Sequence, residues 1–451
     1  VRIWLAGGRG RPAVSRDWKA ILMALEGLVP EHFVFHVPAS IFMMAIQMTH
    51  RLATNHMGCV FTCLAVMPWS CVALCQESTD TSCCTFEAEG RIEYDYNRYH
   101  IDVADLGNGQ DRLGDVRRVE IGLSGKFAKN LKWATSYDFK ADNWMDAYLK
   151  YSSGGQWAIT AGQFKQPQGM EELSSARTGD FISKSSITNM LGLSRRMGVA
   201  YELSTGHIGI ATSVFGRSIT WHGNPADPNR GYALRGYWTP VRSADQTVHL
   251  GFSYTDVTTH GNETRLRARP NADLTAVRLV DTGVIDRVDR QSTSGVELMW
   301  LSTGMKLEAQ LARATVRRQD GLRDFNAHGA YVSGVWNLTG EAWAYRNGVP
   351  VTPKPAQPVR GLWQAGVRYD WVDLDDGYVL PPATPAAVHT VNGTLGGTMD
   401  IWTAGVSVYL RSHLKFMLNY VSVSSDRYDP DEGVSVSDNP AIVEARVQVY
   451  C

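Results

Sequence analysis

The sequence predicts an all-β protein, a transmembrane, antiparallel, up-and-down β-barrel of about 16 strands. Three observations lead to this prediction. From residue 86 to residue 451, short segments alternate apolar with polar residues, aromatic residues recur near the segment ends, and short connections alternate with long ones. Transmembrane β-strands of about 9–11 residues have this pattern, because one face meets lipid and the other faces the lumen.

The alternation assigns two faces to each segment. In the segment 115–127, Val119 and Ile121 share the apolar face, whereas Arg118 lies on the polar face. A helix would need apolar residues three and four positions apart, and these segments lack that spacing. The predicted strands are 86–97, 115–127, 131–141, 143–151, 157–164, 196–203, 207–216, 231–239, 246–256, 290–302, 305–317, 326–338, 361–373, 398–410, 412–424 and 440–451.

The connections between these segments also suit a barrel. Long connections, rich in Gly, Asn, Asp and Pro, are expected to be outer loops, and short ones to be turns at the opposite end. An even number of strands places both chain ends on one side, and about sixteen strands leave an aqueous channel. The predicted long outer loops are 98–114, 217–230, 257–289 and 374–397.

The first 75 residues are interpreted as targeting sequence. Residues 48–75 combine a weakly positive start, an apolar stretch and small residues before a cleavage position near Cys75–Gln76, as a secretory signal peptide does. Residues 76–451 are then assigned to the barrel. Residues 1–47 are an unassigned leader, explained either by a start codon placed too early or by a disordered extension.

Composition excludes several functions. The 44 Lys and Arg against 45 Asp and Glu give a net charge of −1, so no basic excess points to nucleic acid. Six of the seven cysteines precede residue 85 and the seventh is Cys451, which leaves the main body without a zinc or disulfide pattern. The histidines lack paired spacing and no G-x-S-x-G motif is present. We therefore expect no metal, no cofactor and no enzymatic activity.

The connection 165–195, called the third loop below, has a different character. It carries several apolar residues and few strong turn signals, so it should fold in a sheltered place. In a porin that place is the lumen, where a folded loop narrows the pore. Its predicted constriction residues are Lys165, Gly169, Glu171 and Glu172.

The third loop and its surroundings carry a family resemblance over residues 86–451. The matching motifs are Gly162-Gln163-Phe164-Lys165, Gly169-Met170-Glu171-Glu172-Leu173-Ser174-Ser175, Arg195-Arg196-Met197-Gly198-Val199, Gly90-Arg91-Ile92 and Val116-Arg117-Arg118. With these motifs the chain resembles the phosphate- and polyphosphate-selective porin family (O/P porins) of the bacterial outer membrane. The resemblance implies a barrel in the outer-membrane lipid, a homotrimer, and passive passage of phosphate or polyphosphate.

The resemblance also implies site residues. An arginine cluster would consist of Arg91, Arg117 and Arg118, with Asp146 nearby, and a later basic run would include Arg265 and Arg267. Guanidinium groups can replace part of the hydration shell of phosphate with bidentate, charge-assisted hydrogen bonds. On periodicity alone, the polar faces add Lys132, Lys140 and Lys150.

Three features depart from the family pattern. Strict alternation sends Arg117 and Arg118 to opposite faces, so both reach the lumen only at a bulge or a strand start. Glu172 occupies a loop position where the family can carry a lysine, and Glu171 and Glu172 together add two negative charges near the expected constriction. The inward charges are also mixed, and the acidic ones are Glu93, Asp95, Glu120, Asp138 and Asp370. Separately, the chain ends in Tyr450-Cys451, whereas an outer-membrane assembly signal usually ends in an aromatic residue, most often Phe. The alternatives are a general or sugar- or carboxylate-selective porin, and a secreted soluble β-protein such as a carbohydrate-active enzyme or binding module.

Overall fold

The computed structural model describes residues 85–451, apart from 101–109, 221–229, 260–261, 381–389, 412 and 430–431. Internal contacts divide the chain into two units, Val1–Thr79 and Asp80–Cys451, and all described residues belong to the second. The predicted leader and signal peptide lie outside the described residues and stay predictions. No helix in the described part of the chain is long and apolar enough to cross a membrane.

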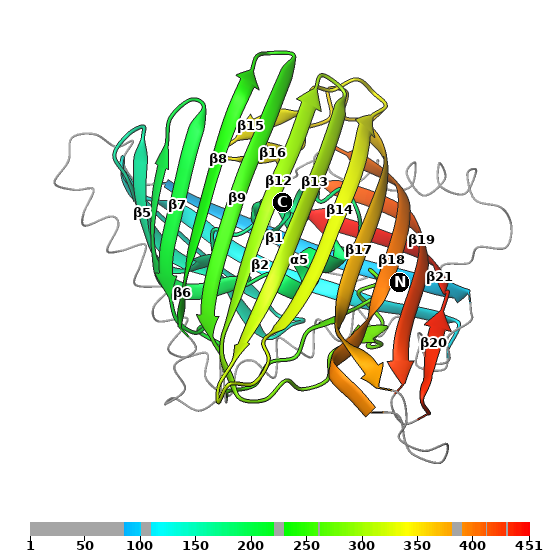
Figure 1. Ribbon diagram of the computed structural model, residues 1–451. Helices are drawn as coiled ribbons and strands as arrows, with labels where there is room; N and C mark the ends of the chain where they lie inside the picture. Colours follow the sequence, from blue (N-terminus) through cyan, green and yellow to red (C-terminus); the bar gives the residue numbers. More distant parts are fainter. Residues whose placement is uncertain are drawn as a thin grey trace, which may run out of the picture. The chain divides into compact units, whose positions relative to one another are not determined.

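The second unit is a closed, antiparallel β-barrel (Figure 1). Each strand of the wall pairs with the next along the chain, and pairing of the first strand with the last closes the ring. The consecutive strands β20 and β21 both pair with β19, one after the other along its length, so they share one position in the wall. The seventeen strands of the sheet therefore fill sixteen positions, and we call each of these positions a stave. Each predicted strand coincides with one stave, which confirms the predicted barrel.

The bounds of the wall strands are β1 Thr85–His100, β2 Arg112–Ala128, β3 Leu131–Asp138, β4 Asn143–Ser152, β5 Trp157–Lys165, β6 Arg195–Ser204, β7 Ile208–Phe215, β8 Gly231–Arg242, β9 Gln246–Thr258, β12 Val288–Ser302, β13 Met305–Arg318, β14 Phe325–Asn337, β17 Leu362–Leu380, β18 Thr390–Leu410, β19 Leu414–Asp429, β20 Val434–Asp438 and β21 Ala441–Tyr450. We call the end of the barrel that carries Cys451 and the β2–β3 turn the turn end, and the opposite end the loop end.

The strands alternate between an outer and an inner face. On β13 the outward Leu311 is 50% exposed, while the neighbouring inward Lys306 and Glu308 are buried. Large apolar side chains recur on the outer face of most staves, where lipid would cover them. The alternation that predicted the strands is therefore the alternation between lipid and lumen.

One predicted outer loop, 374–397, is wrong in its extent. β17 continues to Leu380 and β18 begins at Thr390, with Val379 paired to Val391. A register shift between Asp373 and Asp375 interrupts the alternation at this point, so the sequence pattern stops although the strand continues.

The predicted loop 257–289 does not remain a polar outer loop. It contains the short strands β10 (Arg267–Ala268) and β11 (Val280–Asp281), and its apolar residues pack against buried side chains of the loop-end half of the wall. The prediction of a polar inner face fails in this part of the wall, since several inward residues toward the loop end of β17 to β21 are apolar. That core includes Leu266, Leu279, Val280 and Ile285 from the loop and Val372, Leu374, Met399, Ile401, Val421, Val423 and Ile442 from the wall.

A second inward segment enters from the turn end and was not predicted. Residues 338–361 join β14 to β17 and contain the hairpin β15 (Ala344–Arg346) and β16 (Val349–Val351). The Tyr345 hydroxyl lies 2.7 Å from His249 Nδ1, and the Gly348 carbonyl accepts a hydrogen bond from Arg235. Both wall residues are buried on the inner face, so this hairpin narrows the lumen at the turn end.

The third loop spans the interior between these two segments. It contains α4 (Met170–Leu173), the 3-10 turn η1 (Ala176–Thr178) and α5 (Ser186–Leu191), and Figure 1 shows α5 within the ring of strands. Its backbone carbonyls accept hydrogen bonds from the far wall: Gly179 from Lys415, Ile182 from Arg446 and Ser183 from Arg368. These contacts fix the loop across the lumen, opposite the strands that carry it.

Candidate functional site

The described residues enclose a cavity of about 640 Å³ beside the third loop. Its wall is formed by the inner faces of β1, β2, β4, β13, β14, β17 and β21, together with the third loop, the inward loop between β9 and β12, and the segment 338–361. The charged groups that line it are Arg91, Arg117, Arg118, Lys165, Arg177, Lys184, Arg195, Lys306, Arg368 and Arg446, and Glu89, Glu93, Glu120, Asp146, Glu171, Glu172, Asp180, Asp273 and Glu308.

The three predicted arginines meet in this cavity. Arg91 lies on β1, and Arg117 and Arg118 are adjacent on β2. In the β1–β2 pairing, Glu93 faces Arg118 and Tyr94 faces Val116, so Arg117 is the extra residue of a β-bulge. A bulge lets two consecutive side chains point to the same side. The strand alternation is broken at the one position where the predicted cluster requires it.

Each arginine of this cluster has carboxylate neighbours. Arg91 pairs with Glu93 at 3.3 Å and also bonds Glu120, while Arg118 lies 3.5 Å from Glu93 and 3.4 Å from Asp138. Even so, in the described part of the chain the buried Nε of Arg91 has no hydrogen-bond acceptor, and the buried Arg91 Nη1 and Arg118 Nε lie beside Glu93 without forming a hydrogen bond to it. The cluster therefore keeps donors that its carboxylates do not saturate.

Arg117 is held by a residue of the inward loop between β9 and β12. Its Nε lies 3.2 Å from Asp273 Oδ2, and Arg446 lies 3.7 Å from the same carboxylate. Burial by itself would raise the pKa of the Asp273 carboxyl, but the guanidinium groups of Arg117 and Arg446 outweigh it and lower the pKa to about 2. Asp273 is thus an anion at neutral pH, and its ion pairs hold the loop between β9 and β12 against Arg117 of β2 and Arg446 of β21.

The predicted Asp146 lies in the same cavity and forms a bidentate pair. Arg195 Nε and Nη2 donate to its two carboxylate oxygens at 2.8 and 3.0 Å. Lys165, predicted as a loop residue, ends β5 and donates to the backbone carbonyls of Glu172 and Ser174. The Glu172 carboxylate pairs with Lys184 at 2.5 Å, so the negative charge expected from Glu172 is locally balanced.

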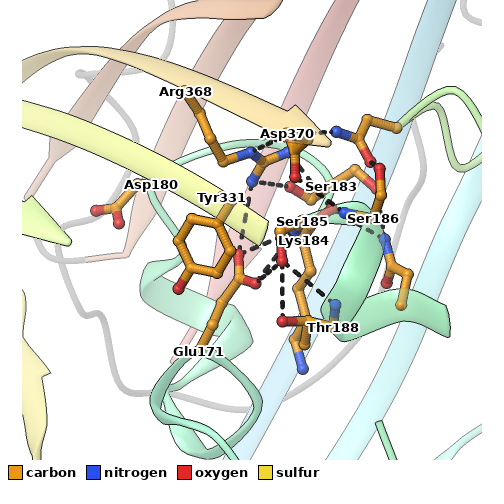
Figure 2. A network of polar contacts seen from close by, with 12 residues as sticks. Glu171, Asp180, Ser183, Lys184, Ser185, Ser186, Thr188, Tyr331, Arg368 and Asp370 are labelled. Atoms are coloured by element: carbon orange, nitrogen blue, oxygen red, sulfur yellow. Dashed lines mark hydrogen bonds and ion pairs between the residues drawn. The ribbon is translucent and has the colours of Figure 1, made fainter. Parts of the chain in front are cut away.

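Figure 2 shows a second polar network, between the third loop and β17. Arg368 is 2% exposed and pairs with Asp370 at 2.8 Å and with Glu171 at 3.5 Å. The Glu171 carboxylate also accepts a hydrogen bond from the Ser185 backbone N–H at 3.0 Å. Burial raises the pKa of Glu171, and the guanidinium of Arg368 opposes that shift. This network anchors the predicted loop residue Glu171.

Gly169 has a structural place in the same loop. It precedes α4 with a φ of 55°, and an added Cβ would lie 3.0 Å from the Gln310 side-chain oxygen on β13. A residue with a side chain would be strained there, both by the backbone and by the close approach. Gly169 therefore lets the loop turn against the wall.

Several cavity residues were missed from the sequence as site residues. Arg368, Arg446 and Lys306 all lie on inner faces of distant staves, so alternation could have placed them in the lumen. Their partners could not have been found that way, since Arg446 bonds Asp95 across the chain closure and Lys306 bonds Asp180 of the third loop. Which inward charges meet depends on how the loops fold.

Five predicted anion-binding residues lie outside the lining of this cavity. Lys140 is beyond the end of β3 and pairs with Asp115 at the surface; Arg265 pairs with Asp281 in an exposed position, and Arg267 is exposed on β10. Lys132 is exposed, and Lys150 pairs with Glu202 at 2.6 Å near the turn end. For Arg265 and Arg267 the physical reason is that their loop turns its apolar side chains inward and its arginines outward.

The site can offer charge-assisted hydrogen bonds to a small anion, in a lumen where basic and acidic groups are nearly balanced. A family model described as phosphate-selective porin O and P matches residues 86–451. An uncharacterized protein of Caulobacter vibrioides is 26% identical over 354 residues, which cover 74% of this chain and 68% of that protein.

Two solved structures are similar in fold. The loop L8 deletion mutant of OmpT, an outer membrane protein of Vibrio cholerae, is 11% identical, with a TM-score of 0.51 over 82% of this chain and 100% of that one. The high-pH structure of Pseudomonas putida OprB is 10% identical, with a TM-score of 0.50 over 82% of this chain and 94% of that one.

Proposed function

This chain belongs to the phosphate-selective porin O and P family of outer-membrane channels, and we propose that it passes small anions, phosphate or polyphosphate, passively through the cavity beside the third loop. The observation that carries this proposal is the bulge that turns both Arg117 and Arg118 inward, next to Arg91. Three guanidinium groups at one point of a loop-narrowed lumen match the geometry of phosphate oxygens.

The carboxylates around the cluster explain how such a pore could release its anion. Each arginine is paired with carboxylates, so an entering phosphate is attracted by the guanidinium charges of Arg91, Arg117 and Arg118 and meets repulsion from Glu93 and Glu120. A conducting site must bind strongly enough to admit the ion and weakly enough to let it go. We propose that the mixed charge supplies the second condition.

A planar-bilayer experiment tests this proposal. The full chain is inserted in chloride solution, and the current block by added phosphate is compared with that of Arg117→Ala/Arg118→Ala. A hydrogen bond to a charged group contributes about 1.5–3 kcal/mol, so losing even one predicts a block weakened by about tenfold or more. The matched control is Arg265→Ala, which removes an exposed arginine outside the cavity. A cation-favouring reversal potential, or equal block in the double variant, would overturn the anion assignment.

A general or sugar- or carboxylate-selective porin is the second candidate. It is favoured by the near balance of acidic and basic side chains around the cavity. Liposome swelling separates the two: a general porin would admit neutral sugars at a rate that the Arg117→Ala/Arg118→Ala variant leaves unchanged, with no phosphate block in either protein.

We further propose that residues 48–75 direct secretion and that the barrel assembles as a homotrimer. The lumen of each barrel is complete within one chain, so trimerisation would add stability rather than complete the pore. Native mass spectrometry of detergent-extracted protein reports the oligomeric state, and N-terminal sequencing of membrane-inserted protein reports cleavage. A monomer, or an intact N-terminus, would contradict the respective part.

A further inference from the structure

A basic patch lies on the outer face of the barrel, at the loop end of β12 and β13. On β13 the outward row runs from Leu307 and Leu311, both exposed and apolar, to Arg313 and Arg317, both exposed and basic. The inward residues between them are buried, so the arginines continue the row that faces lipid. On the neighbouring strand Arg290 occupies the position directly opposite Arg317.

The height of the patch can be worked out from strand geometry. From Trp300 to Arg290, β12 climbs about 25 Å along the barrel axis, at about 3.3 Å per residue and a tilt of about 40°. The apolar band of an outer-membrane barrel is also about 25 Å tall, with aromatic residues at both edges. Two tyrosines lie at the level of Arg313. Tyr254 on β9 is paired with Ser294 of β12, and Ser294 is paired with Arg313 on its other side; the ring of Tyr254 lies 6.0 Å from the ring of Tyr232. The arginines therefore lie at the loop-end edge of the band.

The arrangement is unfavourable without an anion. Arg290 and Arg317 are direct cross-strand partners, and like charges in that position destabilise a sheet. Arg290 has one carboxylate, Asp256 at 3.2 Å. Arg313 donates to the neutral Asn326 side chain, and among the described residues neither Arg313 nor Arg317 has a carboxylate within 4 Å. Two arginines thus face the membrane boundary with their charge uncompensated.

We propose that Arg290, Arg313 and Arg317 bind the phosphate group of a phosphorylated glycolipid of the outer leaflet. Long loops mark the outer side of such barrels, and lipid head-group phosphates lie at the boundary that these side chains reach. Guanidinium groups form bidentate, charge-assisted hydrogen bonds with phosphate. The proposal requires the barrel to span the outer membrane and is independent of the selectivity of its pore.

Native mass spectrometry of the full chain in detergent, titrated with bisphosphorylated lipid A, tests the proposal. The variant is Arg313→Ser/Arg317→Ser, which removes the two arginines without carboxylate partners and leaves the Arg290–Asp256 pair. Binding of lipid A should weaken by about tenfold, and a dephosphorylated lipid A should bind both proteins equally. The matched control, Arg360→Ser, removes an exposed arginine near the turn end and should leave binding unchanged.

Two outcomes would overturn the proposal. One is equal binding of lipid A to the parent and the double variant, with heat-modifiable gel migration showing that both are folded. The other is displacement of lipid A by millimolar inorganic phosphate, which would mark the patch as a site for soluble anions. Phosphate block of the pore should be the same in both proteins, so the lipid site and the proposed channel function can fail separately.

Discussion

Replacing Arg368 by Met removes the centre of the buried network between β17 and the third loop. Arg368 is 2% exposed and Asp370 fully buried, so the substitution leaves two carboxylates, those of Asp370 and Glu171, without their guanidinium partner. Breaking a buried ion pair on one side costs about 3–5 kcal/mol. Asp370 keeps hydrogen bonds from the Ser186 N–H and the Asn271 amide, which favours the lower end of that range.

A loss of about 3 kcal/mol corresponds to a change of more than a hundredfold in the folding equilibrium. Urea unfolding in detergent micelles, followed by tryptophan fluorescence and heat-modifiable gel migration, measures it. The matched control is Arg265→Met, which breaks a bidentate pair with Asp281 in which Arg265 is 46% exposed. An exposed pair contributes much less to stability than a buried one, because solvent screens it. If Arg368→Met shifts the unfolding free energy no more than Arg265→Met does, the network is not a stabilising anchor.

The buried pair of Arg368 and Asp370 allows a stricter test. Arg368→Met/Asp370→Leu removes both charges and should recover part of the loss, because replacing a buried pair by apolar residues is often nearly neutral. A double variant as unstable as the sum of the single changes would show that the two residues do not interact.

Two further changes probe how the inward loops are held. Gly169→Ala should cost about 1–3 kcal/mol in the same unfolding assay, because its positive φ and the nearby Gln310 oxygen both oppose a side chain; an unchanged midpoint would contradict this strain. Since the pKa of Asp273 is lowered to about 2 by Arg117 and Arg446 against the effect of burial, its stabilising contribution should be complete above about pH 4 and be lost as the pH falls towards 2. Acid unfolding of the parent protein and Asp273→Asn should therefore converge at low pH, and a constant difference between them down to pH 2 would count against this assignment.

The staves were predictable because their signal is local. Every strand of the wall presents lipid on one side and the lumen on the other, so its own residues carry the alternation. The hairpin β15–β16 was missed because its two strands pair only with each other inside the barrel, where neither face meets lipid. The strand ends at 374–380 were missed because a register shift interrupts the alternation. At the loop end of β17 to β21 inward residues such as Val421 and Val423 are apolar, so the alternation there does not indicate a lumen face and does not identify the loop that covers it.

The arginine cluster shows what sequence and structure contribute to one site. Arg91, Arg117 and Arg118 could be identified by resemblance, and alternation then required either a bulge or a strand start for both Arg117 and Arg118 to reach the lumen. Their surroundings could not be identified, since Asp273 reaches Arg117 from 156 positions away through a loop fold that no local pattern encodes.

A guanidinium group in a narrow lumen must be paired, because an isolated buried charge is too costly. A pore that uses arginines to attract anions must therefore also supply carboxylates, and the near balance of charge follows from the same physics as the cluster. In the proposed anion channel, selectivity would then depend on how far the carboxylates around Arg91, Arg117 and Arg118 offset their positive charge.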